Sequence, residues 1–203
     1  MIYAVVFDYG RVISFSPPET VIEGLASLGG IDVKTMETLM WKHRDIYDRG
    51  TCSGKDFYRF ILEKAGAHPQ DQVLEEMARI DMDSWTHVNP ETVRLMEEVK
   101  AAGLKLGILS NMPWDFLDLA RKTIPLFKLP SIGIFSCELG LIKPEAAIYQ
   151  KLIEALQCKP EETVFFDDVK VNVEKAQEQG IKAAVWEGPE EARIFLRCQG
   201  LAF

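Results

Sequence analysis

The amino-acid sequence predicts an α/β protein whose parallel sheet is covered by helices and which carries a small helical insertion after its first strand. Short apolar runs rich in Val, Ile and Phe alternate with helical patterns over much of the chain. A strand that is followed by a helix and then by another strand pairs in parallel through a right-handed crossover, so this alternation indicates one helix-covered sheet.

Five apolar runs are expected to be buried strands. In chain order they are Ile2 to Phe7, Leu104 to Leu109, Ile132 to Phe135, Thr163 to Phe166 and Ala183 to Trp186. Four helical patterns accompany the later runs: Pro90 to Ala102, Pro113 to Ile124, Glu145 to Gln157 and Asn172 to Gln179. The first and the last of these helices end at Gly103 and Gly180, because glycine tolerates the left-handed conformation that commonly terminates a helix.

The segment from residue 15 to residue 85 interrupts this alternation. It contains no convincing buried strand, and its amphipathic helical patterns cover Thr20 to Leu28, Val33 to Tyr47, Gly54 to Ala65 and Gln70 to Ile80. We expect an α/β core of residues 1–14 and 86–203 and a helical cap of residues 15–85. The insertion point lies at the carboxyl ends of the strands, where open α/β sheets bind ligands, so the cap is a candidate lid. The alternative is that these helices only thicken the core.

Composition excludes several classes of protein. The chain has 203 residues, of which 47% are hydrophobic and 27% charged, and this balance is typical of a globular domain. Its formal charge of −8, with no basic stripe, disfavours nucleic acid as a partner. No apolar stretch is long enough for a membrane span or a signal peptide, and the four cysteines form no zinc-ligand pattern. We therefore expect a cytoplasmic protein with free thiols and no membrane partner, while the oligomeric state is not readable.

Polar side chains follow the predicted strands at the points where the strands end. Asp8 follows the first strand, Ser110 and Asn111 follow the second, and Asp167 and Asp168 follow the fourth. Lys143 lies in a loop that leads into a helix. Each of these residues alone is common in turns and helix caps, but parallel strands all end at one edge of a sheet, so the whole set is expected to converge there.

This combination of groups is suited to phosphoryl transfer. Clustered carboxylates stay ionised only where cations compensate them, and oxygen-only ligands favour Mg²⁺. The side chains of Ser110 and Asn111 can donate hydrogen bonds to phosphoryl oxygens, while Lys143 supplies a positive charge. Positioning and charge neutralisation account for most of the catalysis in such reactions.

Four motifs carry a family resemblance. They are Asp8-x-Gly10-x-Val12, Leu109-Ser110-Asn111, Lys143-Pro144-Glu145, and Phe165-Phe166-Asp167-Asp168 followed by Asn172. In these motifs the chain resembles the haloacid dehalogenase-like hydrolase superfamily over essentially its whole core. It is similar to bacterial sugar phosphatases of the glucose-1-phosphatase type, which also have an Arg-Gly loop in the cap, here Arg49-Gly50. The resemblance implies a doubly wound, Rossmann-like parallel sheet, a helical cap and a small phosphorylated metabolite as substrate.

The resemblance also assigns roles. Asp8 would be the nucleophile that forms an aspartyl-phosphate, and it would share a Mg²⁺ ion with the Gly10 carbonyl and Asp168. Asp167 would act in the outer shell of the metal, through water or Lys143, and Asn172 would be structural. Arg11 is unusual beside the nucleophile: it either contacts a phosphate oxygen, which suits a guanidinium, or leaves the loop as an exposed side chain.

One position departs from the family pattern. Most phosphatases of the family carry a second aspartate two residues after the nucleophile, as the acid that protonates the leaving group, and here that residue is Gly10. General acid catalysis contributes about 10² to 10⁴-fold, so its loss predicts a slower enzyme, a substrate with a good leaving group such as an anomeric phosphate, or a donor from the cap. Asp45, Asp48 and His43 are the cap residues to consider.

Other functions use similar residues. A response-regulator receiver also combines carboxylates, a hydroxyl and a lysine, but its acidic pair precedes the phosphorylated aspartate. A true dehalogenase would have no use for Asp167 and Asp168 as a metal-binding pair. One alternative to a phosphatase stays open. It is a non-catalytic or regulatory protein that binds a phosphorylated ligand and lost its turnover when it lost the second aspartate.

Overall fold

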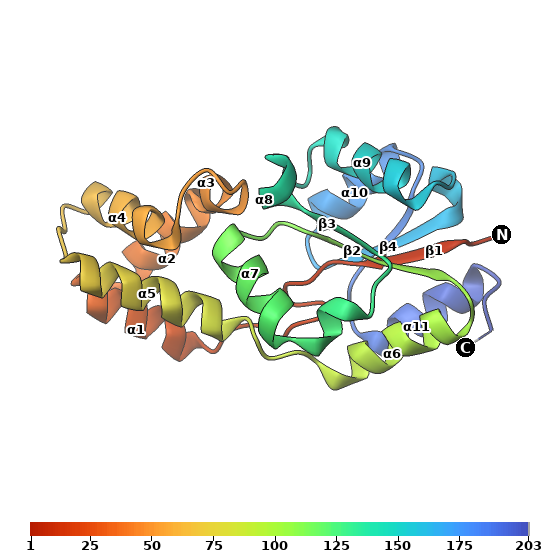
Figure 1. The fold of residues 1–203 in the computed structure, drawn as a ribbon, viewed down its shortest axis with the longest axis horizontal. Coiled ribbons are helices and arrows are strands. Elements are labelled where there is room, and N and C mark those ends of the chain that lie inside the picture. Colours follow the sequence, from red (N-terminus) through yellow and green to blue (C-terminus); the bar gives the residue numbers. More distant parts are fainter. Residues whose placement is uncertain (203) are drawn as a thin grey trace.

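A computed structural model gives the structure of residues 1–202 and confirms the predicted α/β architecture (Figure 1). Five parallel strands form one sheet in the order β3-β2-β1-β4-β5. The strands are β1 (Ala4–Phe7), β2 (Lys105–Ser110), β3 (Ile132–Phe135), β4 (Thr163–Asp167) and β5 (Lys182–Val185). All five predicted strands are therefore confirmed, and the last residue of the predicted core, Phe203, lies outside the described residues.

The helices fall into an inserted group and a core group. The inserted group is α1 (Glu19–Gly29), α2 (Val33–Lys42), α3 (Arg44–Asp48), α4 (Gly54–Lys64) and α5 (Asp71–Ser84). The core group is α6 (Pro90–Ala101), α7 (Trp114–Thr123), α8 (Ser136–Leu139), α9 (Ala146–Leu156), α10 (Lys170–Glu178) and α11 (Pro189–Cys198), with short 3₁₀ turns at Pro125–Lys128 and Pro160–Glu162. The single helix predicted over Val33 to Tyr47 is wrong, because the chain breaks at His43 (φ −118°, ψ 9°) into α2 and α3.

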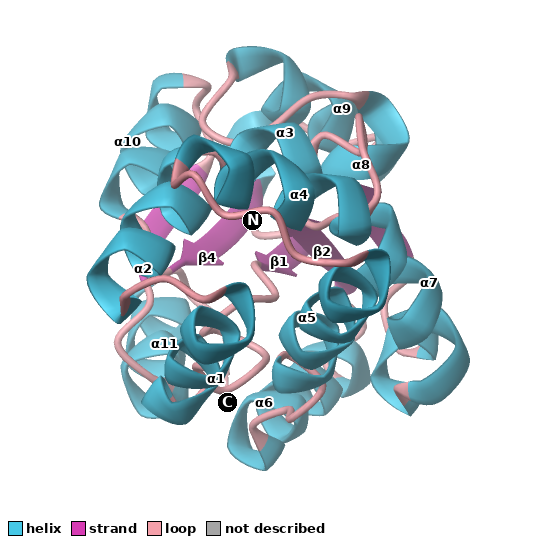
Figure 2. Ribbon diagram, turned by 90° about the vertical axis from the view of Figure 1, so that its left-hand side faces the viewer, coloured by secondary structure: helices cyan, strands magenta, loops and turns pink. Residues whose placement is uncertain are grey.

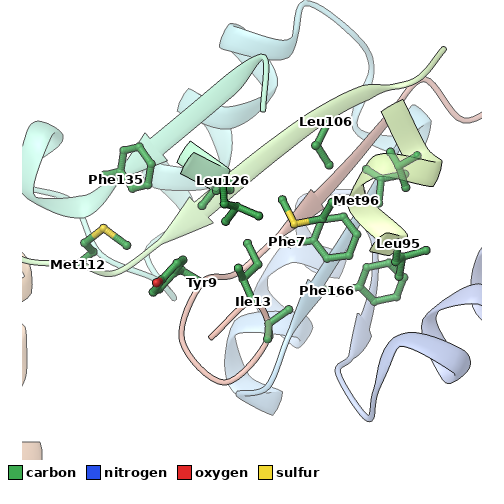
Figure 3. Close-up of a cluster of buried hydrophobic side chains, with 14 of the residues drawn as sticks. Phe7, Tyr9, Ile13, Leu95, Met96, Leu106, Met112, Leu126, Phe135 and Phe166 are labelled. Atoms are coloured by element: carbon green, nitrogen blue, oxygen red, sulfur yellow. The ribbon is translucent and has the colours of Figure 1, made fainter. Parts of the chain in front are cut away.

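Side chains of successive strand residues pack on opposite faces of the sheet, as the two-residue period of a strand requires. On one face, Val5 and Phe7 pack with α6, α7 and α11, and on the other face, Ala4 and Val6 pack with α9 and α10. Figure 3 shows the first of these clusters, in which Phe7 and Phe166 lie beside Leu95 and Met96 of α6. Helices on both faces explain why the strand runs are apolar throughout rather than alternating.

The inserted helices have an apolar cluster of their own, drawn from Leu25 to Ala78. The chain enters and leaves this group through two adjacent segments, which are joined by an antiparallel bridge between Ser14 and Val88. In Figure 1 these helices lie beyond the end toward which the strand arrows point, and Figure 2, viewed from that side, shows them in front of the sheet. The insertion therefore faces the carboxyl ends of the strands.

Candidate active site

Asp8 lies at the carboxyl end of the central strand and is 7% exposed. Its main-chain N–H continues the sheet by donating to the Phe166 carbonyl at 2.9 Å. Its Oδ1 accepts the Tyr9 N–H at 2.7 Å and lies 2.8 Å from Lys143 Nζ. Burial raises the pKa of Asp8 to about 7, although the charge of Lys143 opposes this shift.

Lys143 compensates two buried carboxylates. Its Nζ lies 2.8 Å from Asp8 Oδ1, 2.6 Å from Asp167 Oδ2 and 3.2 Å from the Leu109 carbonyl, so each of its three N–H groups has an acceptor. Its side chain is 1% exposed. Burial by itself lowers the pKa of a lysine, but the two carboxylates outweigh burial here and raise the pKa of Lys143.

Asp167 is fully buried and satisfied by protein groups. Besides Lys143, it accepts the Val169 N–H at 2.8 Å, and the Asn172 amide lies 3.0 and 3.2 Å from its two oxygens. Asp168 is more open, and its Oδ2 lies 3.7 Å from an Arg11 nitrogen. Burial, with help from the Asp167 charge, raises the pKa of Asp168.

Oxygen atoms of Asp8, Asp167 and Asp168 lie within 4.8 Å of one another. These three carboxylates face two cations, Lys143 and Arg11, which leaves one negative charge uncompensated. A cluster of oxygen donors with excess negative charge fits a small divalent cation such as Mg²⁺. Because the oxygens of Asp167 are already hydrogen-bonded within the protein, Asp8 and Asp168 are the carboxylates free to hold an ion directly.

Ser110 and Asn111 follow β2 beside this cluster. The Ser110 hydroxyl lies 3.5 Å from the Asn111 carbonyl and is close enough to Asp8 to lower its pKa. The Asn111 side chain instead binds the Lys143 main chain twice: Nδ2 donates to the Lys143 carbonyl at 3.0 Å, and Oδ1 accepts the Lys143 N–H at 2.8 Å. This pairing fixes the loop that carries Lys143, a role that the sequence did not reveal.

Arg11 connects the acidic cluster to the inserted helices. Its guanidinium reaches toward Asp168 and lies 5.7 Å from the centre of the Trp41 ring, while its side chain stays 49% exposed. Its backbone has a φ of 60°, which is uncommon for a residue other than glycine. Arg11 is thus both half exposed and directed at the site, so the two alternatives drawn from the sequence are not exclusive.

A cavity over Asp8 joins the strand ends to the inserted helices. Its floor includes Asp8, Gly10, Lys143 and Asp168, and its opposite wall includes Trp41, Arg44, Asp45, Asp48 and Trp85. Arg44 is held by Asp81 at 2.8 Å and by Asp48 at 3.1 Å. Tyr47 does not reach the cavity floor but stacks on Phe57 in the apolar cluster of the insertion.

Comparison with known proteins agrees with this arrangement. The profile of the haloacid dehalogenase-like hydrolases matches residues 13–180. The chain belongs to this family. The matched range begins after Asp8, so the role of Asp8 depends on the geometry described above.

Proteins that are similar to this hydrolase include phosphatases. The chain is 27% identical over 188 residues to the phosphatase MT3486 of Mycobacterium tuberculosis. The aligned region covers 90% of this chain and 86% of that phosphatase. It is 32% identical over 112 residues to the phosphorylated carbohydrates phosphatase of Thermotoga maritima, covering 55% of this chain and 51% of that protein. A solved haloacid dehalogenase family enzyme from Bacteroides thetaiotaomicron, in complex with magnesium and inorganic phosphate, has a TM-score of 0.72 at 21% identity, covering 91% of this chain and 94% of that chain. This structural similarity shows that the hydrolase has the same fold as the Bacteroides enzyme.

Arg44 and Trp85 are site residues that sequence reasoning missed or left undecided. Arg44 and Asp48 stand four residues apart on one helical pattern, a spacing typical of an exposed surface pair. An aromatic side chain such as Trp85 can belong either to the core or to a pocket, and the structure places its ring against Gly10. The deciding contact of Arg44 is with Asp81 of α5, and that of Trp85 is with Gly10 after β1.

We expect Gly10→Ala to raise the free energy of unfolding by about 0.4 to 1 kcal/mol. The φ of Gly10 is outside the left-handed region, and an added Cβ would lie 3.4 Å from Trp85 Cζ3, which is an ordinary contact. Alanine therefore fits and restricts only the unfolded chain. Urea unfolding of both proteins measures the difference, and a loss above 1 kcal/mol would show that glycine is required.

Proposed function

We propose that this hydrolase is a Mg²⁺-dependent phosphatase that cleaves a small phosphomonoester, a sugar phosphate, through an aspartyl-phosphate on Asp8. The observation that carries the proposal is the buried group of Asp8, Lys143 and the Asp167–Asp168 pair at the carboxyl ends of β1 and β4. A carboxylate held beside a fixed ammonium, with a place for a divalent cation, is suited to attack phosphorus.

The reaction has two displacements. Asp8 forms a bond to phosphorus while the bond between phosphorus and the leaving oxygen breaks, and that oxygen takes up a proton. Water then attacks phosphorus, which frees Asp8 and releases inorganic phosphate. The Ser110 hydroxyl donates a hydrogen bond to a phosphoryl oxygen, Asn111 holds the loop that carries Lys143, and the charge of Lys143 lowers the pKa of Asp8 against the effect of burial. Asp8, Asp168 and the Gly10 carbonyl would hold the Mg²⁺ ion, which would supply positive charge against the phosphoryl oxygens.

The cavity over Asp8 supports a sugar as the leaving group. Two indole rings, Trp41 and Trp85, line it together with the polar side chains of Asp45 and Asn111. Apolar ring faces with a few hydrogen-bonding groups suit a neutral, hydroxylated ring. The relative from Thermotoga maritima is named for phosphorylated carbohydrates, which agrees with this substrate class.

The proposal assigns different roles to two units of the chain. Residues 15–85 form a cap that shapes the substrate cavity, and residues 1–14 and 86–203 form the catalytic core. All four cysteines are free thiols, which agrees with a cytoplasmic protein. Among the residues described, no helix has the length and apolar character needed to cross a membrane.

A screen of sugar and nucleotide monophosphates, with Mg²⁺ and with EDTA, tests the function. We expect release of inorganic phosphate that requires Mg²⁺ and is fastest with sugar monophosphates. Saturable binding of a phosphorylated sugar without any turnover would favour the regulatory alternative, in which the loss of the second aspartate at Gly10 has abolished catalysis. Nucleotides as the best substrates would overturn the sugar assignment only.

We expect Asp168→Ala to weaken Mg²⁺ binding about 10- to 100-fold, and Asp167→Ala to weaken it much less. Asp168 is open to the cavity, whereas both oxygens of Asp167 are bound by Lys143, Asn172 and a main-chain N–H. Asp167→Ala should instead lower the melting temperature more than Asp168→Ala, because it leaves Lys143 with one partner fewer. Titration calorimetry with Mg²⁺ and thermal unfolding of both variants separate the effects. Equal losses of Mg²⁺ affinity would contradict the assignment.

A further inference from the structure

The proposed reaction needs a proton donor that the core does not provide. An alkoxide is a poor leaving group unless its oxygen is protonated as the bond to phosphorus breaks. Gly10 has no side chain, Lys143 uses its three N–H groups on Asp8, Asp167 and the Leu109 carbonyl, and Asp167 is hydrogen-bonded on both oxygens. Asp168, the remaining core carboxylate that lines the cavity, is assigned to the metal, so the acidic groups left to act as the donor belong to the inserted helices.

Three residues of the insertion were candidates from the sequence, and the structure separates them. The His43 ring packs edge-on against Phe60, with 5.2 Å between ring centres, and is not part of the cavity wall. Asp45 lines the cavity but is exposed to solvent. Asp48 lines the same cavity as Asp8, also lines the adjoining cavity beside Ser110 and Gly10, and has a side chain only 13% exposed.

Asp48 stands where the insertion is fastened to the core. Its main-chain carbonyl accepts a hydrogen bond from the Ser136 hydroxyl. The next residue, Arg49, reaches both oxygens of Glu145 at 2.6 and 3.2 Å and the Gly140 carbonyl at 3.0 Å. Gly50 has a φ of 72° and lies so close to Trp114 that a Cβ would come within 2.6 Å of the indole. The position of Asp48 over the site is thus fixed from the core as well as from the cap.

The surroundings of Asp48 suit a carboxylic acid that holds a proton. Arg44 Nε donates to its Oδ1 at 3.1 Å, and no described group donates to Oδ2. Burial raises the pKa of Asp48, against the opposing charge of Arg44, and the Asp81 carboxylate adds to the rise while Lys143 opposes it. Arg44 orients the carboxyl group through one oxygen and leaves the other available to carry the proton.

We propose that Asp48 is the acid that protonates the leaving oxygen, in place of the carboxylate that position 10 lacks. The proposal rests on the phosphatase function. As Asp8 bonds to phosphorus and the ester bond breaks, the proton of Asp48 passes to the departing oxygen and Asp48 becomes a carboxylate. In the second displacement, Asp48 takes a proton from the attacking water while the Asp8–phosphorus bond breaks, which returns both residues to their starting state.

The test compares Asp48→Asn with the wild type on glucose 6-phosphate and on p-nitrophenyl phosphate. Asparagine keeps the acceptor for Arg44 but has no acidic proton. We expect kcat/KM to fall about 10²- to 10⁴-fold on the alkyl phosphate and to stay within about threefold on the aryl phosphate, whose leaving group needs no proton. The ratio kcat/KM reports only the steps through formation of the aspartyl-phosphate, so the second displacement does not obscure the result.

Asp81→Asn is the matched control. Asp81 binds the same arginine, with 2.8 Å between its Oδ2 and Arg44 Nη1, but it does not line the cavity that contains Asp8. A purely structural effect of the Arg44 network lowers kcat/KM on both substrates by the same factor. Asp81→Asn keeps the acid and removes only one charge that raises its pKa, so we expect from it a much smaller selective loss on the alkyl phosphate than from Asp48→Asn. Equal losses on both substrates for Asp48→Asn, or no loss on either, would overturn the proposal. If Asp8→Asn also retained wild-type rates, the phosphatase mechanism itself would be wrong, so the two failures are distinguishable.

Discussion

Asp8→Asn is expected to lower kcat by about 10⁴-fold or more while the protein stays folded. The amide has nearly the shape of the carboxylate but is a poor nucleophile, so the aspartyl-phosphate does not form. It keeps an oxygen that can accept the Tyr9 N–H and Lys143, the two partners of Asp8 Oδ1. Steady-state assays on the best substrate of the screen measure the loss.

Thermal unfolding supplies the control for Asp8→Asn. Burial already disfavours the charged form of Asp8 and raises its pKa to about 7, so a neutral amide is tolerated there. We expect a melting temperature within a few degrees of the wild type, about the shift that 1 kcal/mol produces in a chain of this length. An Asp8→Asn protein that is folded and turns over at the wild-type rate would contradict covalent catalysis by Asp8.

Lys143→Met is expected to destabilise the protein by about 3 to 5 kcal/mol and to abolish activity. Methionine fills a similar volume but leaves Asp8 and Asp167 buried without their cation. Because the charge of Lys143 lowers the pKa of Asp8, its removal raises that pKa further above the unfolded value. Denaturant unfolding across a range of pH measures both the loss and its pH dependence.

The sign of the pH dependence identifies the cause. A carboxyl group whose pKa is raised by folding binds more protons in the native state, so stability falls as the pH rises from the unfolded pKa through the folded pKa. The unfolded chains titrate alike at Asp8, so the loss in Lys143→Met should be largest well above pH 7, where Asp8 is ionised in the wild type, and should shrink as the pH falls to about 7, the folded pKa of Asp8 in the wild type. Adding Asp167→Asn should recover part of the stability at pH 8. A loss that does not change with pH would mean that packing, rather than charge, is responsible.

The strands and their polar ends could be predicted because their signals are local. All five strand ranges begin and end within two residues of the prediction, and Asp8, Lys143 and the Asp167–Asp168 pair meet as parallel pairing requires. The sheet order and the helix α11 were not readable, since the order of strands depends on long-range packing and α11 follows the last expected strand. The break between α2 and α3 at His43 could not be predicted either, because the apolar spacing of α2 continues into α3.

The cavity wall was the least predictable part of the site. Asp48 was one of three candidates, and its burial in the cavity wall separates it from the exposed Asp45 and from His43, which packs on Phe60. The Asn111 side chain is a similar case: its type suggested a ligand contact, but its amide holds the Lys143 loop. Contacts between distant elements leave no periodic trace in a sequence.

The separate apolar cluster of the inserted helices bears on how such an enzyme evolves. Residues that line the substrate side of the cavity, such as Trp41, belong to helices packed around Leu25, Met36 and Phe57, whereas Asp8 stands on the cluster that contains Phe7. Substitutions on those helices can remodel substrate choice without loosening the packing beneath the nucleophile. Selection can therefore explore new substrates in one unit while the chemistry of the other is inherited unchanged.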